Sequence, residues 1–154
     1  MAEFVTWCVT KRAAFKWCQI MCCLLAILFL IDGRAQWKVY SVIFGTDVFL
    51  AVATLITLGI YFMHVHRSNT KLWINIERVF NLIAVVISTI FAGVLLYDAI
   101  KMEQGDYRHH RYAPQLNIGQ SGWSNRIRIV AVSQVCQAIF YLASLIWVHR
   151  HGLN

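Results

Sequence analysis

Three polar side chains stand inside otherwise apolar stretches of the sequence. Asp47 is the only charged residue between Lys38 and Arg67, and Gln134 and Gln137 lie three positions apart in a second uncharged stretch. Residues three apart share one face of a helix. A carboxylate in the hydrocarbon core costs about 2.5–3.5 kcal/mol on insertion scales, so it should face protein or water rather than lipid. We therefore expect Asp47, Gln134 and Gln137 to form an intramembrane polar cluster.

Such a cluster has two interpretations. In the first, Asp47 carries a proton or an ion, because ionisable residues within a membrane often mark transport paths. In the second, its hydrogen bonds hold helices together, either within this chain or with a partner subunit. The second interpretation is favoured, because a single acid without an intramembrane base makes a poor relay.

The histidines form two pairs near the ends of apolar stretches and one adjacent pair. They are His64 and His66, His149 and His151, and His109 and His110. Imidazoles can ligate zinc or haem. However, residues two apart on a helix point in different directions, and no cysteine or carboxylate completes a set around the end pairs. We expect histidines near lipid headgroups, with no metal and no other cofactor.

The cysteines cluster towards the N-terminus. They are Cys8, Cys18, Cys22, Cys23 and Cys136. Cys22 and Cys23 are adjacent in an apolar run, where thiols are inert. Cys8 and Cys18 lie nearer the membrane surface, where S-palmitoylation is the expected modification.

The positions of the charges predict the elements that carry these residues. Charged residues make up 14% of the 154 residues, against about 25% in an ordinary soluble domain. Four apolar stretches approach or exceed the roughly 20 residues that cross a bilayer. We predict an all-α, integral membrane four-helix bundle with up-down-up-down topology. Its helices span about 13–31, 40–64, 78–99 and 128–149, with a loop at 100–127.

Two details concern the N-terminal region. The first helix reaches spanning length only if it includes Lys16, whose ammonium we expect to extend to the interface. The segment Glu3–Phe15 places Phe4 and Trp7 towards one side and Lys11 nearer the other. This pattern predicts a short interfacial helix lying on the membrane.

The basic residues indicate contact with lipid headgroups and bear on which side of the membrane the termini face. The net charge is +7, but the Lys and Arg residues stand at helix ends, where they meet anionic headgroups. Nucleic-acid binding is therefore not expected. The 14 basic residues divide equally between the two sides. The basic residues before the first helix, and a long loop without cysteine or glycosylation sequon, favour cytoplasmic termini in a multi-pass protein.

The third predicted helix carries small residues at a spacing of four. Ala84, Ser88 and Ala92 form this stripe. Small residues at this spacing let helix backbones approach closely in lipid. We expect the stripe to make a close contact, either inside the bundle or with another transmembrane subunit.

The span pattern resembles a known architecture. Short first and second connections, a longer third one and cytoplasmic tails resemble the MARVEL-type tetraspan proteins, similar to the myelin-and-lymphocyte and synaptophysin-like proteins. The resemblance rests on the span pattern over the whole chain and on no sequence motif. It implies work in membrane apposition, vesicle traffic or junction assembly.

Three hypotheses about function follow. The first is a non-enzymatic tetraspan protein that organises membrane or serves as an accessory subunit of a larger membrane complex, in trafficking, in a junction or in lipid or ion transport. The second is a small oligomeric proton- or ion-coupled transporter or channel that uses Asp47. The third is an enzyme similar to the membrane glutathione transferases, since Glu77-Arg78 followed by Asn81 partly resembles their Glu-Arg…Asn motif. The spacing to Asn81 is short and the following acid is absent, so that activity is not carried over. The first hypothesis is preferred because the chain is small, has few soluble parts and shows no catalytic set.

Overall fold

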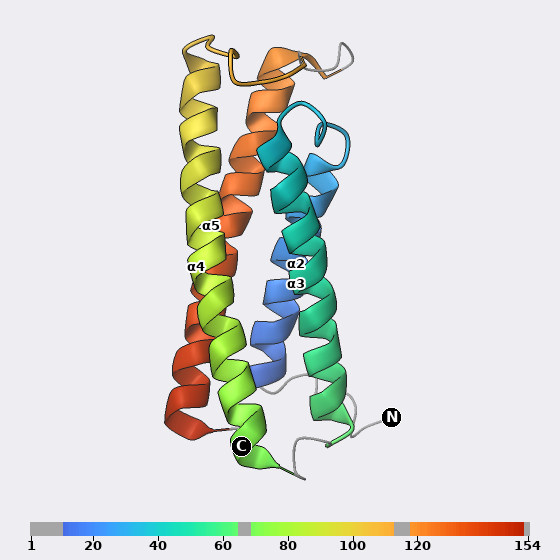
Figure 1. The fold of residues 1–154 in the computed structure, drawn as a ribbon, viewed down its shortest axis with the longest axis vertical. Helices are drawn as coiled ribbons and strands as arrows, with labels where there is room; N and C mark the ends of the chain where they lie inside the picture. Colours follow the sequence, from blue (N-terminus) through green and yellow to red (C-terminus); the bar gives the residue numbers. More distant parts are fainter. Residues whose placement is uncertain (1–10, 65–68, 113–117, 153–154) are drawn as a thin grey trace.

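The chain folds into four long helices that lie side by side (Figure 1). The computed structural model describes residues 11–64, 69–112 and 118–152. The helices are α2 (Lys11–Leu30), α3 (Lys38–Phe62), α4 (Thr70–Glu103) and α5 (Gly119–His151). No strand occurs in the described residues. The predicted all-α fold is confirmed.

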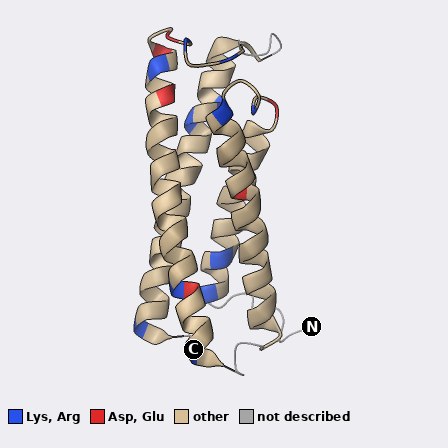
Figure 2. Ribbon diagram, in the orientation of Figure 1, with Lys and Arg blue, Asp and Glu red and all other residues tan. Residues whose placement is uncertain are grey.

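All four helices are long and apolar enough to cross a membrane. The start of α2 and the end of α5 lie at the same end of the bundle, which we call the termini end (Figure 1). The connection between α4 and α5 lies at the opposite end, which we call the loop end. Charged residues gather towards these two ends (Figure 2). The chain is therefore a multi-pass membrane protein with up-down-up-down topology. The predicted interfacial helix falls largely on residues 1–10, outside the described residues.

The predicted loop at 100–127 was too long. Helix α4 has 34 residues and continues to Glu103, and α5 has 33 residues and begins at Gly119. Charged residues end the apolar stretches but not the helices, because a helix can continue beyond the hydrocarbon core into the polar interface. At its start, α4 is capped by Asn69, whose side chain accepts a hydrogen bond from the backbone N–H of Leu72 at 3.3 Å.

The helices pack closely in the spatial order α3, α2, α5, α4. Helices α3 and α4 follow each other in sequence but are not among the closely packed pairs. The largest apolar core cluster lies towards the loop end and includes Leu95, Tyr40, Trp123 and Ile127, all fully buried. The turn between α2 and α3 passes directly over Trp123. A Cβ at Gly33 would overlap the Trp123 indole, so this position requires glycine.

The outward faces of the helices are apolar. Leu28, Phe49 and Val132 each expose more than 60% of their surface, and similar side chains cover the four helices. A soluble protein rarely exposes such a continuous apolar surface. Such a surface is typical of a helical bundle that lies in a lipid bilayer.

Candidate functional site

Asp47 lies at the centre of the first buried polar group, which we call the central cluster. Its carboxylate is fully buried and accepts two hydrogen bonds from α5. Gln134 Nε2 donates to Asp47 Oδ2 at 2.7 Å, and Gln137 Nε2 donates to Asp47 Oδ1 at 3.3 Å. The structure thus brings together the three residues that the sequence placed in one cluster. Both glutamines approach from one face of α5, as their spacing requires.

The central cluster connects two helices that are not closely packed against each other. Helices α3 and α5 are also joined by Thr54 and Tyr141, whose hydroxyls lie 3.0 Å apart. Both residues are buried. Long polar side chains therefore join α3 and α5, whose backbones are not closely packed against each other. This arrangement holds the register of the two helices.

The second buried group, near the termini end, is an ion pair that sequence reasoning missed. Lys16 Nζ lies 2.5 Å from Glu77 Oε1, and both side chains are at most 2% exposed. Asn81 Nδ2 donates to Glu77 Oε1 at 3.0 Å, and Tyr61 donates to Glu77 Oε2 at 2.7 Å. Lys16 Nζ also lies 3.4 Å from Asn81 Oδ1. We call Lys16, Tyr61, Glu77 and Asn81 the ion-pair cluster.

The expectation that Lys16 extends to the interface was wrong. On α2, Lys16 shares the buried face with Ala13, Ile20 and Cys23, so its stem points into the bundle. The ammonium is stabilised there because Glu77 supplies the opposite charge and Asn81 a further acceptor. The only sequence signal was the helical spacing of Lys16 with these apolar residues. That signal does not tell which face of α2 turns inward.

The third buried group lies at the loop end and contains Asp98, Tyr40, His109 and His110. We call it the histidine cluster. His109 Nε2 lies 2.6 Å and His110 Nε2 2.9 Å from the same atom, Asp98 Oδ1. Tyr40 donates a hydrogen bond to Asp98 Oδ2, and its hydroxyl lies 3.4 Å from His110 Nε2. Asp98 is fully buried, and the His110 side chain is 1% exposed.

Aromatic rings surround the histidine cluster. The Trp37 ring lies 5.1 Å from that of His109 and 6.1 Å from that of His110. The Tyr107 ring packs edge-on against His110 at 5.7 Å. The loop is held over these rings by a backbone hydrogen bond of 2.6 Å from the Arg111 N–H to the Gln36 carbonyl. The His110 side chain is thus buried and that of His109 partly buried, and both rings contact protein groups.

The same loop contains an exposed turn. Arg108 donates hydrogen bonds to Asp106 from its backbone N–H and from its guanidinium. The Arg108 side-chain hydrogen bond, the largest cause, lowers the pKa of Asp106 to about 2. Asp106 therefore stays ionised at neutral pH, with Arg108 and Lys101 as its ion-pair partners.

The Ala84–Ser88–Ala92 stripe faces the bundle. Ala84 and Ser88 are fully buried, and Ala92 is partly buried. Ala84 packs in a core cluster with Tyr141 of α5 and Cys23 of α2. The structure therefore places the buried part of the stripe against helices of the same chain.

The remaining sequence candidates are two cysteines of the N-terminal region and the histidines near the ends of α3 and α5. Cys18 is partly buried, whereas Cys8 and His66 lie outside the described residues. His64 and His149 are exposed, and His151 stacks on Trp147 with ring centroids 4.3 Å apart. Those that the structure describes belong to none of the three buried clusters.

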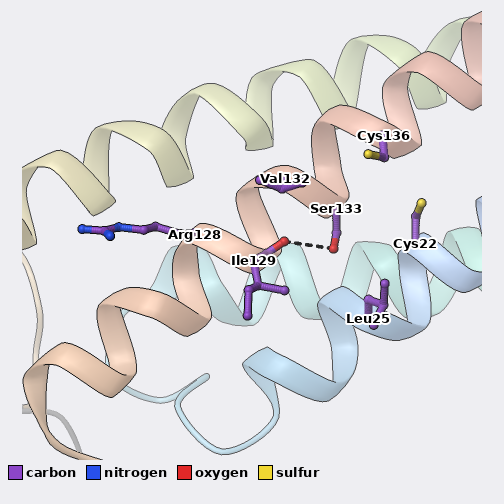
Figure 3. Close-up of a pocket in the computed structure, with 7 residues that line it drawn as sticks. All are labelled: Cys22, Leu25, Arg128, Ile129, Val132, Ser133 and Cys136. Carbon is purple, nitrogen blue, oxygen red and sulfur yellow. Dashed lines mark hydrogen bonds between the residues drawn. The ribbon is translucent and has the colours of Figure 1, made fainter.

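A cavity of about 340 Å³ lies between α2 and α5 (Figure 3). Cys22 and Leu25 line it from α2, and Val132, Ser133 and Cys136 from α5, with Arg128 and Ile129 towards the loop end. The Ser133 hydroxyl donates to the Ile129 carbonyl at 3.0 Å, so it is already hydrogen-bonded within its own helix. Arg128 forms an ion pair with Glu103. The lining thus presents mainly apolar groups and thiols to the cavity.

Comparisons of the chain with protein-family models, curated proteins and solved structures find no match.

Proposed function

We propose that this chain is a non-enzymatic tetraspan membrane protein that organises membrane or serves as an accessory subunit of a larger membrane complex. In this proposal its termini are cytoplasmic and its architecture is of the MARVEL type. Its basic helix ends contact anionic headgroups. Trafficking, junction assembly and support of a transport complex are the roles that this architecture suits.

The proposal is supported by the direction of the acidic side chains in the membrane-spanning helices, which point into the bundle. Asp47, Glu77 and Asp98 are all buried, and each is hydrogen-bonded to other side chains of the same chain. The surface left for recognition is apolar and faces the bilayer. A protein of this kind selects its partners through shape and close packing within the membrane.

Helix α4 offers the largest part of that surface. It buries 28% of its apolar span, against 44% for α2, because it packs closely only against α5. Val79, Ile83, Val86 and Ile90 project from it and are each more than half exposed. This face is the best candidate for contact with another transmembrane subunit.

The test is the mass of the native assembly. The chain is solubilised from its own membrane in a mild detergent and its complexes are separated by native electrophoresis. A hetero-complex of constant composition is the expected result. Migration as the bare chain or as a pure homo-oligomer would contradict an accessory-subunit role.

A second candidate, proton- or ion-coupled transport, is favoured by one observation. Ionisable side chains are buried at three depths of the bundle, in the ion-pair, central and histidine clusters. A buried base, Lys16, accompanies the buried acids. Proton flux into liposomes reconstituted with the purified chain tests this candidate. Flux that disappears in Asp47→Asn would establish transport and displace the first proposal.

A further inference from the structure

We propose that the histidine cluster is a zinc site with Asp98, His109 and His110 as its protein ligands. This proposal replaces the sequence-based expectation that the chain binds no metal. That expectation rested on the end pairs of histidines, for which no carboxylate was in view. In the structure, the loop brings two imidazoles to a carboxylate of α4.

The donor set is appropriate for a transition metal. The candidate ligand atoms of Asp98, His109 and His110 all lie within 4.8 Å of one another. Two imidazole nitrogens and a carboxylate oxygen are ligands that Zn²⁺ prefers. Three protein ligands leave the fourth tetrahedral position open for water.

The distances between the imidazole nitrogens and the Asp98 carboxylate are those of hydrogen bonds, with protons where a metal ion would lie. Both Nε2 atoms point at Asp98 Oδ1, from 2.6 and 2.9 Å. In tetrahedral coordination with metal–ligand bonds of about 2.0–2.1 Å, two donor atoms stand about 3.3 Å apart. Opening each Nε2–Oδ1 distance by roughly half an ångström would admit the ion. The Nε2 protons would move to Nδ1, which leaves a lone pair on each Nε2 for the metal.

Charge also favours a cation here. Glu77 in the ion-pair cluster has Lys16 as its counter-charge. Asp98 is equally buried, yet in the described part of the chain its ion-pair partners are the two histidines alone, without Lys or Arg. A buried carboxylate needs a compensating charge. A divalent ion held by Asp98 and two neutral imidazoles would supply it.

The surroundings hold the ligands in place and leave an entrance. Tyr40 donates to Asp98 Oδ2, the oxygen that the histidines do not contact, and so orients the carboxylate. The Trp37 ring packs against both imidazoles. The His109 side chain is 24% exposed, so an ion can reach the site from the aqueous side of the loop. Bound zinc would fix the loop at the loop end to α4.

The test uses the full chain in detergent, stripped of metal with a chelator and then titrated with Zn²⁺ against a chromophoric competitor. We expect one zinc ion per chain by elemental analysis. Asp98→Asn and the double variant His109→Ala/His110→Ala should each lose at least about 100-fold in affinity, since even outer-shell changes cost 10–100-fold. The matched control is His64→Ala/His149→Ala, which removes two histidines elsewhere and should bind like the unaltered chain.

Two further measurements keep the result interpretable. The metal-free Asp98→Asn variant should elute as the unaltered chain does and unfold at a similar temperature, because asparagine preserves the side-chain volume and adds no uncompensated charge. Co²⁺ in place of Zn²⁺ should give the intense visible bands of four-coordinate cobalt, lost in both ligand variants. Sub-stoichiometric zinc, or equal affinity in the ligand variants and the control, would overturn the proposal. Loss of zinc in the His64→Ala/His149→Ala control would overturn it as well.

Discussion

Tyr61 follows Tyr40 by 21 residues on α3, and each donates a hydrogen bond to a carboxylate of α4. Their acceptors, Asp98 and Glu77, are separated by the same interval on the antiparallel helix. At 1.5 Å per residue the two bonds stand roughly 30 Å apart, which is the thickness of the hydrocarbon core. Helices α3 and α4, which are not among the closely packed helix pairs, are therefore joined near both ends of the bundle.

Removing the Tyr61 hydroxyl should destabilise the bundle. Tyr61→Phe leaves the buried Glu77 Oε2 without this donor, and an unsatisfied buried acceptor costs about 1–3 kcal/mol. Unfolding of the purified chain in a denaturing detergent titration measures the loss. Tyr97→Phe is the control. Tyr97 lies on α4 and is 56% exposed, so removal of its hydroxyl should change the stability little. Equal stability of Tyr61→Phe and the unaltered chain would show that this bond contributes nothing.

The ion pair of Lys16 and Glu77 should show strong coupling. Lys16→Met leaves an uncompensated buried carboxylate, and Glu77→Gln leaves an uncompensated buried ammonium, each at a cost of about 3–5 kcal/mol. The double variant should be more stable than the sum of the two losses predicts. A double-mutant cycle by the same unfolding titration measures this coupling. Additive losses would mean that the two charges do not stabilise each other.

Asp47 should tolerate asparagine better than leucine. Asparagine keeps a side-chain oxygen that accepts from Gln134 or Gln137, whereas leucine leaves both amide donors buried and unpaired. We expect Asp47→Asn to assemble normally and Asp47→Leu to give less folded protein in the membrane. Fluorescence-detected size exclusion compares the two. Indistinguishable profiles would remove the helix-joining role of the central cluster.

Gly33 should be the least replaceable glycine. Gly33→Ala forces a methyl group into the Trp123 ring, and overpacking of this kind costs about 1–3 kcal/mol. Gly45→Ala is the control, since a Cβ there meets no atom within 4 Å and alanine favours a helix. Adding Trp123→Phe should restore part of the stability of Gly33→Ala by shortening the ring. If Gly33→Ala and Gly45→Ala unfold alike, the close approach of Trp123 to the turn is wrong.

The fold could be predicted from charge placement, but the full lengths of α4 and α5 could not. The uncharged stretches mark the hydrocarbon core, and helices are the structures that satisfy the backbone there. Beyond the core, residues such as Lys101 and Arg126 belong equally well to a helix end or to a loop. Local capping and packing decide whether such residues are helical, and the placement of charges gives no information about either.

The buried clusters differ in how far the sequence reveals them. Asp47, Gln134 and Gln137 are polar residues deep inside apolar stretches, so their meeting follows from the cost of facing lipid. Lys16 lies near a helix end, where extension to the interface is an equally good solution for the ammonium. The approach of His109 and His110 to Asp98 depends on the path of a loop, and residue spacing carries no information about it.

Recognition of a partner through α4 is tested most directly by substitutions on its lipid-facing surface alone. Ile83→Trp and Ile90→Trp enlarge exposed side chains that have no buried role, so the isolated bundle should unfold as before. Val135→Trp and Ile139→Trp do the same on the exposed face of α5, away from the cavity lining, and serve as controls. The quantity measured is the mass of the native assembly in mild detergent. We expect the α4 variants to lose the larger complex and migrate as the bare chain, while the α5 variants keep it. An unchanged assembly in the α4 variants, or the same loss from both helices, would contradict recognition through α4.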